Sequence, residues 1–220
     1  MDSRIRTHAD ILVDHCTDLD PSDDVLIRAP PAAEDLAVAV AERVGEVGAN
    51  PSVSLQSDRA TRAYLQASDA EDFETPEHLL AMMESADAFI LIKGDQNTAE
   101  RSDVPTETLA AYRRARRPVQ EARMGKRWVG TQFPASGNAQ KAEMSTEEYE
   151  EFVYEAVNKD WEEQKAHQQQ LVEILDPAEE VRIVSGDTTD VRMSVAGMKT
   201  VNDDGRKNLP GGEVFTAPVP

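Results

Sequence analysis

The first half of the chain alternates short apolar runs with longer stretches in which apolar residues recur every three to four positions. Residues 25–27 are apolar throughout, which is typical of a buried strand. After Pro30 and Pro31 a helical period follows and closes near Gly48, a residue that favours the end of a helix. The apolar positions of this period are Leu36, Val40, Val44 and Val47. The spacing therefore predicts a strand followed by a helix.

The same alternation continues to about residue 130. Further strands are expected at residues 53–55, at residues 88–92 and around Val129. Further helices are expected after Ser57, from Thr75 and Pro76 onward, and over residues 106–117. Parallel strands need long crossover connections, which are usually helices. We therefore expect an α/β fold, with a largely parallel sheet flanked by helices.

The second half begins with helical signals and ends with short strands. Ser145 and Glu148 have the spacing of a capping box, in which each side chain binds a free main-chain N–H of the first helical turn. Another helix is expected from about 161 to 175, because Pro177 cannot continue it. From Val181 the pattern changes to short strands with turn residues. We therefore place an N-terminal α/β domain at residues 1–177 and the beginning of a β-rich second domain at 178–220.

The charge balance limits the classes of partner. Lysine and arginine total 23 against 42 acidic residues, so the formal net charge is −19. Such a surface repels polyanions, which argues against nucleic acid or an anionic membrane as partner. An acidic surface with so few lysines is similar to that of proteins from salt-loving organisms, where molar salt shortens the Debye length to about 3 Å. We therefore expect a halophilic archaeal origin, and the alternative is an ordinary acidic cytosolic protein.

The cysteine content and the N-terminal sequence indicate the cellular compartment. Cys16 is the only cysteine, which excludes an intrachain disulfide and predicts a buried free thiol in a reducing compartment. The N-terminal residues contain no apolar stretch of signal-peptide length. The longest apolar run, at residues 88–92, is too short to span a bilayer. We expect a cytoplasmic protein.

The segment NLPGGEVFTAP, residues 208–218, places a single carboxylate among turn-forming and apolar residues. Pro210, Gly211 and Gly212 predict a tight turn that allows another main chain to approach closely. Glu213 is the one charged side chain of the segment. It is either part of a functional site or a solvated residue at the start of a strand.

Three further segments, taken together with the one around Glu213, resemble the thermophilic-type metallo-aminopeptidases, the aminopeptidase T and leucyl aminopeptidase family, in the family's order. They are RWVGTQFPA at 127–135, MSTEEYEEFVYEAVNKDW at 144–161 and VRIVSGDTTDVRMSVAG at 181–197. The resemblance covers about the second half of the chain. It implies an enzyme that removes N-terminal residues from peptides, uses a pair of divalent metal ions (zinc, cobalt, manganese or magnesium) and is a homodimer at full length.

Within this resemblance Glu213 is the residue that matches a metal-site glutamate, because it directly precedes Val-Phe-Thr. The family's other ligands lie C-terminal to the EVFTAP segment, beyond Pro220. The resemblance therefore implies that residues 1–220 are an N-terminal portion without aminopeptidase activity of its own. The alternative is a non-catalytic α/β module for binding or dimerisation.

Other chemically capable residues show weaker patterns. The four histidines His8, His15, His78 and His167 lack the spacing of a helical metal-binding pair, and no functional role is expected for them. Asp187 and Asp190 are either site residues or a turn residue and a solvated neighbour. The basic cluster on the predicted helix is expected to pair with surrounding acids; it consists of Arg113, Arg114, Arg116 and Arg117. Gly94 and Asp95 follow a predicted strand, but without a phosphate-binding motif we expect no nucleotide site.

Overall fold

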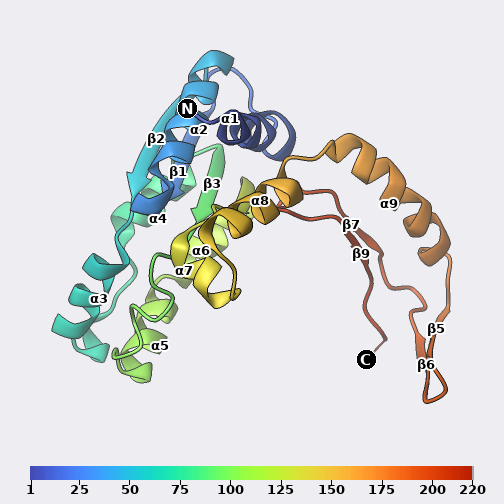
Figure 1. The fold of residues 1–220 in the computed structure, drawn as a ribbon. Helices are drawn as coiled ribbons and strands as arrows, with labels where there is room; N and C mark the ends of the chain where they lie inside the picture. The colour runs from blue at the N-terminus through green and yellow to red at the C-terminus, as the bar shows by residue number, and fades with distance from the viewer. Residues whose placement is uncertain (220) are drawn as a thin grey trace. The chain divides into compact units, whose positions relative to one another are not determined.

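The computed structural model describes residues 1–219, and the chain divides into two compact units, Met1–Asn158 and Lys159–Pro220 (Figure 1). Helix α9 (Trp161–Leu175) belongs to the second unit because it packs against strands β7 (Val201–Asp203) and β9 (Glu213–Phe215). The spatial division thus lies before α9, whereas the sequence pattern placed a domain boundary after residue 177. That domain boundary stays a prediction.

The first unit alternates helices and strands. Its strands are β1 (Asp24–Ala29), β2 (Asn50–Leu55), β3 (Ala88–Lys93) and β4 (Arg127–Gln132). Its α-helices are α1 (Ser3–Asp10), α2 (Glu34–Val47), α3 (Asp58–Ala67), α4 (Glu77–Ser85), α5 (Thr106–Ala115), α6 (Arg117–Met124), α7 (Ser136–Lys141) and α8 (Thr146–Val157). A π-helical segment, Ile11–Cys16, and two 3-10 turns, Pro31–Ala33 and Ala70–Asp72, complete the described elements.

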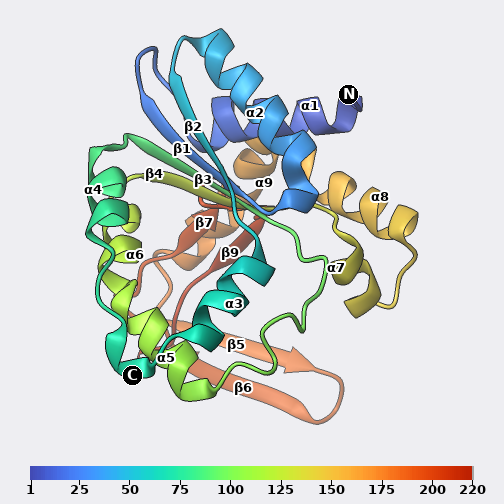
Figure 2. The ribbon, with the colours of Figure 1, turned by 90° about the vertical axis from the view of Figure 1, so that its left-hand side faces the viewer.

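The four strands of the first unit lie in the order β2-β1-β3-β4, and every neighbouring pair is parallel. Ile27 of β1 lies opposite Val53 of β2 and Ile90 of β3. Figure 2 shows helices α1 and α2 together on one side of these strands, and α4 and α6 together on another. Burial is almost continuous along β3, as expected for a parallel strand that is covered on both faces. The predicted α/β fold with a parallel sheet flanked by helices is confirmed.

The helix expected over 106–117 is in fact two helices. Helix α5 ends at Ala115, and α6 begins at Arg117 with Pro118 in its first turn. Proline suits this place because the N–H that it lacks would have no helical partner there. Helix α6 was not predicted, since its sequence RPVQEARM shows too few apolar residues for a helical period.

The core of the first unit includes a histidine. His8 of α1 is fully buried, and its Nε2 lies 2.7 Å from the Thr131 hydroxyl of β4. Burial lowers the pKa of His8 to about 3, so the ring is neutral near pH 7. Its Nδ1 is buried and contacts no hydrogen-bonding partner among residues 1–219. His8 is therefore a core residue, and Cys16, nearby in sequence, is buried and not part of a disulfide, as predicted.

The second unit contains α9 and short antiparallel strand pairs. Strands β5 (Glu180–Ser185) and β6 (Thr189–Ser194) form a hairpin, and β7 pairs with β9. A two-residue strand, β8 (Asn208–Leu209), lies between β7 and β9 in sequence. The change to short strands after residue 180 agrees with the sequence pattern. Across residues 1–219, every helix is too short or too polar to traverse a bilayer.

Candidate metal-binding carboxylate

Glu213 begins strand β9, directly after the Pro210-Gly211-Gly212 turn. Gly212 has φ +101°, a conformation that side chains other than glycine rarely adopt, and its N–H donates to the main-chain oxygen of Asp203 at 2.7 Å. A Cβ atom at Gly211 would lie 2.9 Å from Oδ1 of Asp203 and from the main-chain nitrogen of Gly205. Both glycines therefore allow the close main-chain approach that the sequence predicted.

Asp203 lies opposite Glu213 in the antiparallel β7–β9 pair. Burial raises the pKa of the Asp203 carboxyl, the main-chain N–H of Gly205 opposes that change, and the nearby Glu213 and Asp204 raise the pKa further. The Glu213 side chain itself is exposed and makes no ion pair with the described residues. The sequence analysis did not single out Asp203, because the pairing register was not visible in the sequence.

Side chains of α9 contact the β7–β9 strand pair and the residues next to it. Gln168, which is buried, donates from Nε2 to the main-chain oxygens of Glu213 at 2.9 Å and of Asp203 at 3.2 Å. Lys165 forms an ion pair of 3.1 Å with Asp204. A Cβ atom at Gly205 would lie 2.8 Å from the ring of Trp161, so glycine is needed where the β7 end meets α9. The main chain that carries Glu213 is thus fixed while its carboxylate stays accessible.

The described residues do not by themselves make a complete metal site. Within residues 1–219 no three histidine, cysteine, aspartate or glutamate side chains are grouped so that they could hold one ion. A catalytic metal ion is usually held by about three protein ligands. Glu213 and Asp203 supply two carboxylates at most, so the assignment of Glu213 as a ligand stays a prediction.

The other sequence candidates have contacts of their own, none of which involves Glu213. Asp190 pairs with Arg182 across the β5–β6 hairpin at 2.7 Å, and Asp187 lies in the exposed turn of that hairpin. In the basic cluster, Arg117 pairs with Glu121 at 2.7 Å, as expected. Arg116 instead stacks on Tyr112, with 4.7 Å between its guanidinium carbon and the ring centroid. Within the described residues, the expectation that the cluster pairs with acids therefore fits Arg117 but not Arg113, Arg114 or Arg116.

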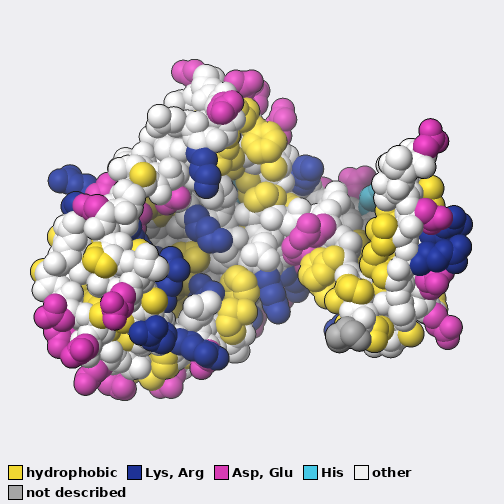
Figure 3. Space-filling view, turned by 90° about the horizontal axis from the view of Figure 1, so that it is seen from below, with side chains coloured by type: hydrophobic (Ala, Val, Ile, Leu, Met, Phe, Trp, Pro, Cys, Tyr) yellow, Lys and Arg dark blue, Asp and Glu magenta, His cyan; other side chains and the backbone are white. Residues whose placement is uncertain are grey.

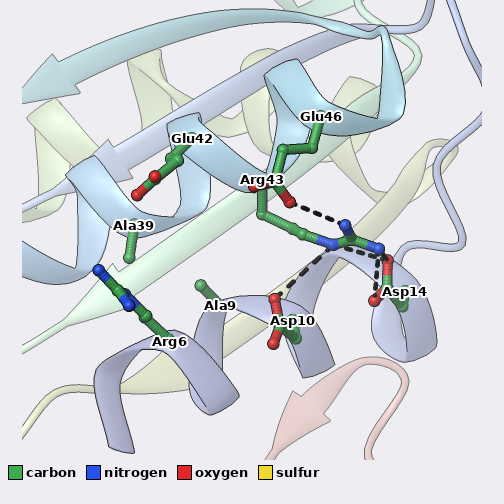
Figure 4. Close-up of a pocket in the computed structure, with 8 residues that line it drawn as sticks. All are labelled: Arg6, Ala9, Asp10, Asp14, Ala39, Glu42, Arg43 and Glu46. Atoms are coloured by element: carbon green, nitrogen blue, oxygen red, sulfur yellow. Dashed lines mark hydrogen bonds and ion pairs between the residues drawn. The ribbon is translucent and has the colours of Figure 1, made fainter. Parts of the chain in front are cut away.

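A hollow of about 450 Å³ lies between α1 and α2 (Figure 4). Arg43 crosses it and contacts three carboxylates, Glu46 at 2.9 Å, Asp14 at 3.0 Å and Asp10 at 3.7 Å. Hydrogen bonds to Glu46 and Asp14 raise the pKa of Arg43. Because these three acids are already paired with Arg43, the ion pairs link the segments on either side of the hollow. They do not leave the three carboxylates free to bind a metal ion together.

Comparison with known proteins gives two findings and one negative result. No curated protein sequence matches this chain. A solved structure of wild-type AmpT from Thermus thermophilus matches with a TM-score of 0.78 and 21% identity, over 98% of this chain and 62% of that one. At this identity the likeness establishes the fold, and this chain spans less than two thirds of the AmpT chain. The sequence model described as thermophilic metalloprotease (M29) matches residues 1–220, and the chain therefore belongs to the M29 metalloprotease family.

Proposed function

We propose that the protein is a metal-dependent aminopeptidase that removes N-terminal residues from peptides. The observation that carries this proposal is the family match over residues 1–220, which includes the segment around Glu213. The similarity of the fold to that of AmpT supports it. In this proposal Glu213 is one ligand of a pair of divalent ions, for which zinc, cobalt, manganese and magnesium are the candidates, and the remaining ligands come from outside the described residues.

Three features of Glu213 favour this role over that of a solvated strand residue. Its carboxylate is exposed and free of ion pairs within the described chain, so no lysine or arginine competes with a cation for it. A carboxylate offers the oxygen donors that divalent ions accept. Its main-chain oxygen is held by Gln168, which limits the movement of the strand that presents it. We propose in addition that the full-length enzyme is a homodimer.

The proposal is tested by comparing the 220-residue chain with a protein extended through the downstream coding sequence. We expect the extended protein to hydrolyse leucine p-nitroanilide when cobalt or zinc is added, and the 220-residue chain to be inactive. Glu213→Gln in the extended protein should reduce both bound metal and turnover, the latter about a hundredfold, which corresponds to about 3 kcal/mol. Analytical ultracentrifugation of the same protein tests the dimer.

A matched control is Glu173→Gln, which changes an exposed glutamate of α9 in the same unit. This control should keep native metal content and turnover. Near-native activity and metal content in Glu213→Gln would overturn the role of Glu213. An extended protein that binds no metal and cleaves no aminoacyl substrate would favour the non-catalytic alternative.

A further inference from the structure

Arg28 of strand β1 is a partly buried cation without a carboxylate partner. It lies on the face of the sheet opposite to Ile27, which points into the core. None of the acidic side chains in residues 1–219 lies within ion-pair distance of its guanidinium group, and no side-chain hydrogen bond satisfies it there. In a chain with 42 acidic residues, carboxylates are plentiful, so the lack of one beside Arg28 needs an explanation.

The groups around Arg28 are aromatic rings and further arginines. Its guanidinium carbon lies 5.7 Å from the ring centroid of Phe89, and Arg123 lies at the same distance from that ring. Burial lowers the pKa of Arg28, Arg116 and Arg123 lower it further, and Tyr112 opposes this change. Three guanidinium groups therefore share one region of positive charge, supported by aromatic faces.

Arg123 adds a buried, unsatisfied donor to this region. Its guanidinium carbon lies 5.1 Å from the ring centroid of Trp128, and its Nε is buried without an acceptor among residues 1–219. Burying a cationic donor without an acceptor is costly. Like charges that are held together without a counterion favour the binding of an anion.

A cavity of about 130 Å³ lies beside Arg28, under helices α4 and α6. Its apolar lining includes Leu26, Leu79, Met83, Phe89 and Val119. Ser54 and Gln56 add polar groups at the β2 side. Figure 3 shows lysine and arginine side chains beside apolar side chains on one face of the protein. An apolar cavity of about 150 Å³ is known to hold benzene, so this one suits a ligand of about six or seven heavy atoms.

We propose that this cavity binds a small organic monocarboxylate with a short branched apolar group, of the size of isovalerate, whose carboxylate pairs with Arg28. An arginine fork matches the two oxygens of a carboxylate. The apolar end would lie against Leu26, Leu79 and Phe89. Inorganic phosphate fits less well, because its oxygens would meet apolar walls and only one of the arginines lines the cavity. Glu213 is not among the residues that line this cavity, and the test of the proposal is independent of peptidase activity.

The test is isothermal titration calorimetry, in which the 220-residue protein is titrated with sodium isovalerate in a low-chloride buffer. We expect saturable binding, and at least tenfold weaker binding of the neutral isovaleramide and of the cationic isopentylamine. Arg28→Gln should weaken isovalerate binding at least tenfold. The matched control is Arg114→Gln on α5, which removes the same charge from an exposed position outside the cavity and should leave the affinity unchanged.

A second variant keeps the positive charge of Arg28 and fills the cavity. Leu79→Trp should fill the cavity and abolish isovalerate binding while Arg28 is retained, which also covers the case that Arg28→Gln does not fold. Circular dichroism spectra verify that each variant is folded. The proposal is overturned if isovalerate does not bind, if neither variant weakens its binding, or if phosphate displaces it with equal or greater affinity.

Discussion

The side-chain amide of Gln168 joins α9 to the residue that carries the proposed metal ligand, with 2.9 Å between its Nε2 and the main-chain oxygen of Glu213. The same nitrogen donates to Asp203, so one buried side chain holds both strands of the β7–β9 pair. Neither contact is visible in the sequence, because Gln168 and Glu213 are far apart along the chain. The position of Glu213 therefore depends on a helix residue outside the EVFTAP segment.

The first prediction concerns this amide. Gln168→Leu keeps most of the side-chain volume but removes one hydrogen-bond donor from each of two main-chain oxygens, those of Glu213 and Asp203, which should lower the free energy of unfolding by about 1–3 kcal/mol. Urea unfolding followed by circular dichroism measures the loss. The control is Gln169→Leu, an exposed position on the same helix, which should change stability by less than about 0.5 kcal/mol. Equal stability of the two variants would show that the Gln168 hydrogen bonds contribute nothing.

The second prediction compares two glycines of the first unit. A Cβ atom at Gly137 would lie 2.4 Å from the main-chain oxygen of Asp95, and main chain cannot move away as a flexible side chain can. Gly137→Ala should therefore destabilise the unit by about 1–3 kcal/mol. Gly45, within α2, has no atom within 4 Å of such a Cβ, so Gly45→Ala should stabilise by about 1 kcal/mol. Thermal unfolding midpoints that shift in the same direction for both variants would contradict the prediction.

The third prediction is a pH dependence that arises from His8. Its pKa is about 3 in the folded protein and about 6.5 when unfolded, so the unfolded chain binds more protons between these values. Stability is then complete above about pH 6.5 and falls as the pH decreases toward 3, with a slope of up to about 1.4 kcal/mol per pH unit from this group. His8→Gln should remove that part of the slope.

The measurement is the free energy of unfolding of wild type and His8→Gln from pH 7.5 to 4.5. The difference between the two proteins isolates His8 from the carboxylates, which titrate in both. His167→Gln, at an exposed position of α9, is the control and should keep the wild-type slope. A wild-type protein and His8→Gln variant with parallel profiles would mean that His8 is not protonated on unfolding.

The extent to which the sequence predicted the structure depends on how local each signal is. Strand β3 was predicted because five consecutive apolar residues define it. Glu213 and its turn were identified because the prolines and glycines around it are adjacent in sequence. The Asp203–Glu213 pairing and the hydrogen bond between His8 and Thr131 could not be predicted, since they depend on the register and packing of distant segments. The cavity beside Arg28 was missed for the same reason.

The fourth prediction concerns Arg43, whose removal would leave Asp10, Asp14 and Glu46 facing one another without a cation. These pairs are partly exposed, so solvent weakens each of them, and Arg43→Gln should cost about 1 kcal/mol in 0.1 M salt. The cost should shrink in molar salt, which screens the remaining repulsion. Arg117→Gln, which breaks only the exposed pair with Glu121, is the control and should change stability by less than about 0.5 kcal/mol. A cost for Arg43→Gln that is independent of salt would indicate lost packing rather than lost charge.

The last prediction extends this argument to the whole surface, whose formal charge is −19. Carboxylates repel one another over about 10 Å in 0.1 M salt and over only about 3 Å in 1 M salt, so added salt removes a contribution that opposes the compact state. The unfolding midpoint should therefore rise steadily from 0.1 to 3 M potassium chloride, as measured by circular dichroism. Sulfate also strengthens the burial of apolar groups, so a comparison at equal ionic strength separates that effect from screening. A rise in chloride indicates screening and supports adaptation to salt, whereas a midpoint that stays constant or falls in chloride would rule out the halophilic interpretation.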